Sequence, residues 1–309
     1  MKKQAKLKET LPFSVNPNSS QVIIIQKKTS LERSLTPLET SENSLQKAHN
    51  DHHRVLDKLT AFLEKIHISY TVLSIDQVLL YPFFQGSHGF KIPVIALGGD
   101  GTLLHASHYV GSTIPLLGIN SSKEHSVGHL CAGSESNLEQ CVAFLMGEQN
   151  SVFKKSYLPR LSLHNDREEL ILPCALNDIL FCHQHPAATS RYHVCVNDLY
   201  SQKHKSSGIW FSTSAGSSAA VSSYGHPLLS LTDPSFYMVV RELYAPREGI
   251  TFFKGQGSDF IFVKSHMNHG MVSVDGHDWS LKLGFYDSFT VRLLNENHLC
   301  LITSNDQLI

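Results

Sequence analysis

The stretch VIALGGDGTLL, residues 94–104, restricts the fold more than any other part of the chain. Its apolar half is typical of a central parallel strand that is covered on both faces. The run stops at three glycines that surround one carboxylate, Asp100, and a leucine-rich, helix-compatible run follows. The sequence therefore predicts a buried strand that turns sharply into a helix, with an acidic side chain at the turn.

The same alternation continues on both sides of this stretch. Candidate strands cover residues 21–28, 70–74, 92–99 and 114–120. Apolar residues recur at helical spacing between residues 55 and 66, and residues 102–110 can also form a helix. The pattern predicts an N-terminal α/β domain with a mostly parallel sheet.

The pattern changes near residue 150, where short β-rich runs begin to dominate. They predict a second, mainly antiparallel and sandwich-like domain, in which Asp275-Gly276 is a plausible hairpin turn. We expect a flexible tail over residues 1–20, the α/β domain over 21–148 and the β-rich domain over 149–290. We expect a C-terminal segment over 291–309, which could return to the α/β domain.

Composition excludes several classes of partner. Of the 309 residues, 41% are hydrophobic and 17% are charged, and the net charge is −1. This charge gives no reason to expect nucleic acid or an anionic membrane as a partner, and no apolar run has membrane-spanning length. The six cysteines form no C-x-x-C pair, which is typical of reduced thiols in a cytoplasmic protein. His183 and His185 have no obvious third metal ligand, so we expect no metal site there.

The glycine turn has two possible roles. Glycines that lead into a helix expose backbone N–H groups near the positive end of the helix dipole, which suits a phosphate. Asp100 could then hold Mg²⁺ or accept the proton of an attacking hydroxyl, and Thr102 could donate to a phosphate. Alternatively, Asp100 is only the N-cap of the helix, and from this stretch alone the two interpretations are equally good.

Two further stretches carry polar groups in apolar surroundings. CALNDILFCH places Asn177 and Asp178 inside an apolar run, where they suit ribose hydroxyls or the edge of a base, or else form a bulge or turn. SSGIWFSTSAGSSAAVSSYG, residues 206–225, offers hydroxyls and backbone N–H groups to a second phosphorylated ligand. Its apolar flanks argue against a flexible linker.

GGDGT, PLLGIN, ALNDIL and STSAGSSAA follow one another in the order, and at about the spacing, of the NAD kinase family, which the sequence resembles over most of residues 20–300. GGDGT alone is shared with diacylglycerol kinases. ALNDIL followed by PAATSRY and SSGIWFST is most similar to the plant-type NADH kinase branch.

The resemblance implies an active site between the two domains, the second of which binds the dinucleotide. It implies transfer of the ATP γ-phosphate to the 2′-hydroxyl of the adenosine ribose of NAD or NADH, giving NADP or NADPH. Mg²⁺ would accompany ATP, other divalent cations are possible, and no side chain is assigned as a metal ligand. The working form would be a homo-oligomer, a dimer or tetramer.

The resemblance also assigns residues. Asp100 would be the catalytic base, Asn177 and Asp178 would bind the acceptor, and His129 takes a place where the family usually has an aromatic residue. The full set of expected binding residues is Gly98, Gly99, Gly101, Thr102, Asn120, His129, Asn177, Asp178, Ser207, Thr213, Gly216, Ser217, Ser218, Ala219 and Ser223.

The sequence departs from the family near the expected acceptor. Ser207 stands where the commoner pattern has Asp, Ala220 where an aromatic residue is common, and Asp178 where Glu is more frequent. We therefore predict that NADH is used at least as well as NAD. The alternatives are a lipid kinase that shares GGDGT and a nucleotide-binding sensor without activity. LLGINSSKEHSVGHL lacks the Gly-Thr-x-Asn-Asp segment of the lipid kinases, and Asp100 would be unnecessary in a sensor.

Overall fold

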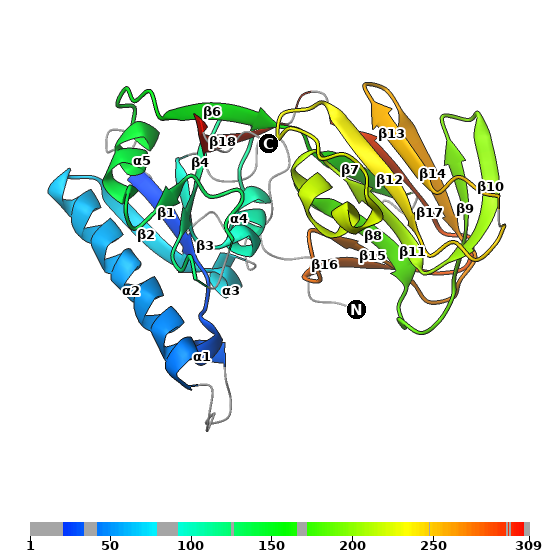
Figure 1. The fold of residues 1–309 in the computed structure, drawn as a ribbon, viewed down its shortest axis with the longest axis horizontal. Helices are drawn as coiled ribbons and strands as arrows, with labels where there is room; N and C mark the ends of the chain where they lie inside the picture. Colours follow the sequence, from blue (N-terminus) through cyan, green and yellow to red (C-terminus); the bar gives the residue numbers. More distant parts are fainter. Residues whose placement is uncertain are drawn as a thin grey trace, which may run out of the picture.

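The computed structural model describes residues 21–33, 42–78, 92–124, 127–165, 172–246, 248–294, 296 and 298–305. The expected tail over residues 1–20 lies outside them. Figure 1 shows an α/β half and a β-rich half side by side along the long axis of the molecule. This arrangement confirms the predicted fold class.

A seven-stranded sheet forms the centre of the α/β half. Its path runs in the order β2 (Ser69–Ser74), β1 (Gln21–Gln26), β3 (Val94–Gly98), β4 (Leu116–Asn120), β18 (Leu299–Ser304) and β6 (Phe153–Leu158), and β5 (Gly133–Ser134) also pairs with β4. All pairs are parallel except the one between β18 and β6. The carboxyl ends of β1, β3 and β4 therefore meet at one edge.

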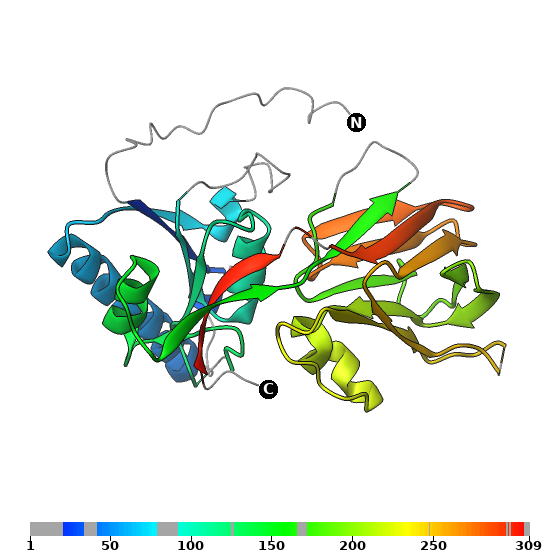
Figure 2. The same ribbon diagram turned by 90° about the horizontal axis from the view of Figure 1, so that it is seen from above.

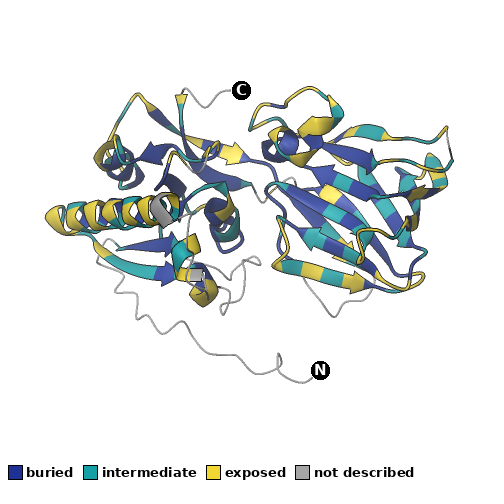
Figure 3. Ribbon diagram, turned by 60° about the horizontal axis from the view of Figure 1, so that its bottom comes forward, coloured by how far each residue is buried: buried dark blue, intermediate teal, exposed yellow. Residues whose placement is uncertain are grey.

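Helices cover both faces of this sheet. The helices are α1 (Ser30–Arg33), α2 (Glu42–Lys65), α3 (Ile75–Val78), α4 (Asp100–Ser107) and α5 (Leu138–Leu145). Val55, Leu59 and Leu63 of α2 pack with α5 on one face, as their helical spacing predicts, and the opposite side of α2 is exposed (Figure 3). Leu103 and Ala106 of α4 cover the other face. Among the described residues, no helix is long and apolar enough to span a membrane.

Two antiparallel sheets form the β-rich half. One has the order β10 (Tyr200–Ser206), β9 (Ser190–Val196), β14 (Phe260–Ser265), β17 (Ser288–Leu293) and β7 (Leu161–Asn165). The other has the order β13 (Phe252–Gln256), β12 (Ser235–Arg241), β11 (Gly208–Ser212), β8 (Asp178–His183), β15 (Gly270–Val274) and β16 (Trp279–Leu283). Two short 3₁₀ helices, η1 (Ala215–Ser218) and η2 (Ala220–Tyr224), follow β11.

Aromatic residues fill the space between the two antiparallel sheets. Phe181 of β8 and Phe211 of β11 come from one sheet, and Tyr192 of β9 and Phe289 of β17 come from the other. The ring of Phe289 lies 5.2 Å from that of Phe181 and 6.2 Å from that of Phe211, centroid to centroid. This core makes the β-rich half a sandwich.

The chain passes between the halves twice, at points that lie close together where the two halves meet. β6 and β18 lie side by side in the sheet of the α/β half and lead into and out of the β-rich half (Figure 2). One apolar cluster also spans the halves, because Leu176 and Ala215 pack with Leu103 and Ala106 of α4. The helix that follows the glycine turn therefore lies against both halves.

Candidate functional site

The glycine turn joins β3 to α4. β3 ends at Gly98, Gly99 is the N-cap, and α4 begins at Asp100. A Cβ on Gly98 would lie 2.2 Å from the hydroxyl oxygen of the buried Thr102, whereas a Cβ on Gly101 would meet no described atom within 4 Å. Gly98 is therefore needed for packing, and Gly101 leaves the start of the helix open. The interpretation of Asp100 as the N-cap is wrong, because Gly99 takes that position.

Two backbone donors hold the carboxylate of Asp100. The N–H of His129 donates to Oδ2 at 3.0 Å, and the N–H of Leu130 donates to Oδ1 at 2.8 Å. Each oxygen keeps a further lone pair for another partner. The side chain is thus fixed in one orientation at the positive end of α4 and can still accept a proton or a hydrogen bond.

Asn120 supports the loop that supplies these donors. It ends β4 at the same edge of the sheet, is buried, and accepts the N–H of Ser122 on Oδ1 at 3.0 Å. Gly128 adopts φ +67°, and a Cβ there would lie 2.4 Å from Nδ2 of Asn120. Only glycine lets this loop approach Asn120 so closely.

A pocket of about 230 Å³ lies beside this loop, between the halves. Residues 127–131 line one side, and the other side is lined by Ser214, Ala215, Ser218, Leu228, Leu229 and Leu231. The backbone that holds Asp100 therefore also forms a wall of this pocket.

Asn177 and Asp178 lie at the start of β8, where a buried carboxylate organises the backbone. The side chain of Asp275 is fully buried and accepts three backbone N–H groups, those of Leu176, Asn177 and Asp178, at 2.8–2.9 Å. Asp275 itself has φ 48°, in the turn between β15 and β16. Three donors to one charged group fix this segment firmly.

The carboxyl group of Asp178 is buried near Asp275, where a negative charge is unfavourable. Burial raises its pKa to about 7, the charge of Asp275 adds to the increase, and a 2.9 Å hydrogen bond from Nδ2 of Asn177 partly opposes it. The side chain therefore changes protonation state near neutral pH, which lets it act as a donor or an acceptor towards a ligand.

His105 of α4 and His108, the residue that caps the C-terminal end of α4, reach across to the β-rich half. Nε2 of His108 lies 2.9 Å from Oδ2 of Asp275, and Nε2 of His105 lies 2.9 Å from Oδ2 of Asp278. Burial lowers the pKa of His105, although the charge of Asp278 opposes this. The helix that begins at Asp100 is thereby tied to the turn that holds Asn177.

Arg160 fixes the other end of α4. Its side chain is fully buried, and its guanidinium donates to the carbonyl oxygens of Ser107 at 3.2 Å and Val110 at 2.8 Å. A cation is favourable at the C-terminal end of a helix, and burial lowers its pKa to about 10. Arg160 still carries its charge at neutral pH.

The turn after β11 is fastened to the same backbone. The N–H of Thr213 donates to the carbonyl oxygen of Asn177 at 3.0 Å, and the hydroxyl of Thr213 donates to the carbonyl oxygen of Leu176. A Cβ on Gly216 would lie 2.1 Å from the carbonyl oxygen of Asn177. Ser217 is buried and holds Leu229 of the pocket wall, whose N–H donates to its hydroxyl at 2.9 Å.

The remaining predicted residues lie further out. Ser218 and Ser223 are exposed and Ala219 is half-buried, all on or between η1 and η2, and only Ser218 of these three lines the pocket. Ser207 does not join the others within this chain, because it precedes β11 whereas Thr213 follows it. β11 lies between them, and the six residue steps from Ser207 to Thr213 span about 20 Å at about 3.3 Å per residue.

Sequence reasoning missed the residues that hold the site together. Asp275 was expected only as part of a hairpin turn, and His108 and Arg160 were not singled out. The Asp275-Gly276 dipeptide, which is typical of a turn, is the one local sequence signal for Asp275, and it does not reveal which backbone groups the carboxylate binds.

Comparison with known proteins gives the same assignment as the motifs. Residues 35–146 match the family model described as the ATP-NAD kinase N-terminal domain. A probable NADH kinase from Oryza sativa subsp. japonica is 36% identical over 177 residues, which are 50% of this chain and 53% of the relative. An NADH kinase from Arabidopsis thaliana is 32% identical over 205 residues, 59% of this chain and 64% of the relative. The match thus spans about half to two thirds of these relatives, and the predicted resemblance is confirmed.

A solved structure agrees over a longer stretch. The crystal structure of yeast NADH kinase complexed with NADH matches with a TM-score of 0.66 at 16% identity, covering 93% of this chain and 84% of the yeast chain. At this identity the likeness establishes the fold of both halves.

Proposed function

Since residues 35–146 form an N-terminal domain of the NAD kinase family, we propose that this protein is an NAD(H) kinase. It transfers the γ-phosphate of ATP to the 2′-hydroxyl of the adenosine ribose of NAD or NADH and releases NADP or NADPH. The observation that carries the proposal is the carboxylate of Asp100, which two backbone N–H groups hold at the start of α4, beside the pocket between the halves.

Asp100 is the proposed general base. The 2′-hydroxyl is a poor nucleophile until it loses its proton, and a base must lie about 2.6–3.2 Å away to accept it. The fixed carboxylate has lone pairs for this, and the glycines beside it leave backbone N–H groups open to the phosphates. In this proposal the glycine turn binds the phosphates of ATP, and the carboxylate accepts the proton of the dinucleotide's 2′-hydroxyl.

Mg²⁺ fits the site as a companion of ATP. This ion usually binds through one or two carboxylates together with substrate phosphates. Among the described residues, no group of three potential ligand side chains gathers around Asp100, so the donor set suits an ion held mainly by the nucleotide. No side chain is assigned as its ligand, and when bound the ion would neutralise phosphate charge. Other divalent cations that prefer oxygen ligands suit the same arrangement.

Asn177 and Asp178 are the proposed acceptor ligands. Their shared hydrogen bond and the rigid backbone behind them present an amide and a carboxyl group together, which suits the hydroxyls of a ribose. Thr213, Gly216 and Ser217 keep η1 in place beside them. We also propose that NADH is used at least as well as NAD, which the two plant relatives named NADH kinase support.

A coupled assay tests the proposal. The protein would be incubated with ATP and Mg²⁺, with NAD, NADH or a diacylglycerol as the acceptor in separate reactions. We expect NADP and NADPH to form and the lipid to remain unphosphorylated, with kcat/KM for NADH at least equal to that for NAD. Phosphorylation of the lipid alone, or of no acceptor, would contradict the proposed function.

We propose a cytoplasmic homo-oligomer, a dimer or a tetramer, as the working form. The six cysteines are all free thiols, which suits a reducing compartment, and the family resemblance supports the oligomer. Light scattering of the purified protein would measure the subunit number, and a monomeric mass in an active preparation would exclude the oligomer.

A further inference from the structure

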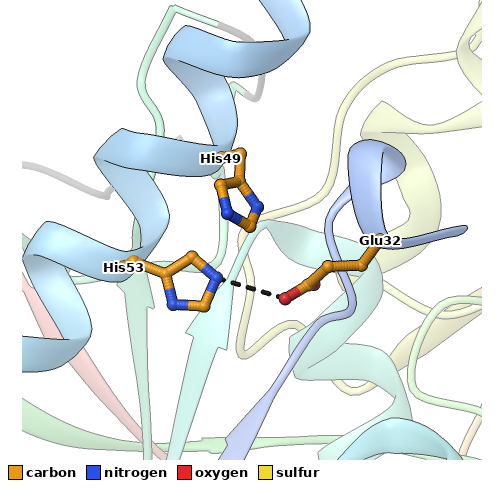
Figure 4. A group of neighbouring side chains, drawn as sticks. All are labelled: Glu32, His49 and His53. Atoms are coloured by element: carbon orange, nitrogen blue, oxygen red, sulfur yellow. Dashed lines mark hydrogen bonds and ion pairs between the residues drawn. The ribbon is translucent and has the colours of Figure 1, made fainter. Parts of the chain in front are cut away.

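Three side chains of the α/β half form a cluster that the proposed reaction does not use. Glu32 of α1 and His49 and His53 of α2 each present one potential ligand atom, and these atoms lie within 4.8 Å of one another (Figure 4). Among the described residues, no other three such side chains bring potential ligand atoms this close together.

The two histidines are placed by the geometry of α2. They are four residues apart, so they lie on the same face of the helix one turn apart. Their ring centroids are 4.3 Å apart, and Nε2 of His53 lies 3.1 Å from Oε1 of Glu32. Two histidines at this spacing on a helix, completed by a carboxylate, are a common arrangement for binding zinc.

Thr29 orients two of the three side chains. Its backbone N–H donates to Oε2 of Glu32 at 2.7 Å, and its buried hydroxyl lies 3.1 Å from the same oxygen and 2.9 Å from Nδ1 of His49. Because a carboxylate only accepts, the single hydroxyl hydrogen goes to Glu32, and Nδ1–H of His49 donates to the hydroxyl oxygen. Nε2 of His49 then carries the lone pair that a metal ion needs.

Glu32 is a charged ligand in this cluster. Its Oε2 is held by the backbone N–H and the hydroxyl of Thr29, and its Oε1 faces Nε2 of His53 at 3.1 Å. An anionic oxygen beside two imidazole nitrogens favours a divalent ion of intermediate softness over Mg²⁺, which prefers oxygen ligands.

We propose that Glu32, His49 and His53 bind a divalent transition-metal ion of the zinc or cobalt class, with water in a fourth position. Ligand atoms in a tetrahedral site of this class lie about 3.3 Å apart, given metal–ligand distances of about 2.0–2.1 Å. The Glu32–His53 pair already has this spacing, and no ligand atom needs to approach another by more than about 1.5 Å. The ion would link α1 to α2 and is separate from the Mg²⁺ proposed to accompany ATP.

Metal titration of the full chain without an affinity tag tests this proposal, with no need for kinase activity. Zn²⁺ binding would be followed by calorimetry, and Co²⁺ binding by the visible absorption of tetrahedral Co²⁺, both in excess Mg²⁺. The variants are His49→Gln, His53→Gln and Thr29→Val, and the matched control is His164→Gln, which changes an exposed histidine on β7. Circular dichroism would show that each variant is folded.

We expect one ion per chain in the unmodified protein and in His164→Gln. Thr29→Val, which alters only the support of the ligands, should weaken binding about 10–100-fold, and loss of either histidine should weaken it at least as much. Failure of the unmodified protein to bind one equivalent, or equal affinity in all four variants, would overturn the proposal and leave Glu32 and His53 as an ion pair only.

Discussion

Asp100→Asn separates the proposed chemistry of the glycine turn from its architecture. The amide has the shape of the carboxylate, but it cannot take up a proton at neutral pH. If Asp100 is the base, the loss should lower kcat by about 10²–10⁴-fold. This corresponds to about 3–5 kcal/mol in the activation free energy.

The structure adds a second cost to this substitution. Both carboxylate oxygens accept backbone N–H groups, from His129 and Leu130. The amide keeps one oxygen, so one of these N–H groups would face an NH₂ group, and an unmade hydrogen bond of this kind costs about 1–3 kcal/mol. We therefore expect the free energy of unfolding to fall by about 1–3 kcal/mol, which is less than the catalytic loss.

The assay measures kcat, the KM for ATP and the free energy of unfolding for Asp100→Asn and for a matched control. Asp76→Asn makes the same chemical change on α3, where the side chain is 60% exposed. The control should retain its kcat. A folded Asp100→Asn protein with nearly normal kcat would refute the catalytic role, and loss of ATP binding together with activity would assign Asp100 to the Mg²⁺–nucleotide site instead.

Three further predictions concern the acceptor side. Asn177→Ala should raise the KM for the dinucleotide by a factor that corresponds to about 1–3 kcal/mol, while the KM for ATP stays nearly unchanged. Equal increases in both KM values, measured by steady-state kinetics, would refute acceptor binding. Because the pKa of Asp178 is raised to about 7 by folding, its neutral form stabilises the protein below about pH 4 and this contribution is lost as the pH rises through 7. Urea unfolding from pH 4 to pH 8 should show this decline, and Asp178→Asn should flatten it. Gly216→Ala should cost about 1–3 kcal/mol in unfolding free energy, because the new Cβ would lie 2.1 Å from the Asn177 carbonyl oxygen, and an unchanged melting temperature would contradict that contact.

Local sequence signals predicted the elements on which the site is built. The apolar run that ends at Gly98 specifies β3, and the helical spacing of Val55, Leu59 and Leu63 specifies the buried face of α2. Both signals depend on side-chain periodicity within a few residues, and both elements formed where they were expected. The sequence marked Asn177 as a polar residue inside an apolar run, but it did not predict that β8 begins directly after this residue.

The contacts that fix these elements were not predictable in this way. Asp275 lies 97–99 positions along the chain from the backbone groups that it binds, and Arg160 lies 50 and 53 positions from the carbonyl oxygens that it caps. Neither contact produces a repeating pattern of polar and apolar residues in the sequence. Asp275-Gly276 is also compatible with an ordinary hairpin turn. The dipeptide alone therefore does not indicate that the carboxylate binds the backbone of residues 176–178.

α4 connects the two chemical tasks of the site. Its first residue carries the proposed base, Arg160 holds its last turn, and His108 joins it to the carboxylate of Asp275, which in turn fixes the backbone of Asn177. Proton transfer tolerates only a few tenths of an ångström of error between base and hydroxyl, since it requires a heavy-atom distance of about 2.6–3.2 Å. A site divided between two halves meets that tolerance only if the halves share a rigid element, and α4, clamped from both, is that element. The buried side chains of Arg160 and Asp275 bind only backbone groups and His108 among the contacts described above, and they would act by keeping the two sides of the proposed site at a fixed distance.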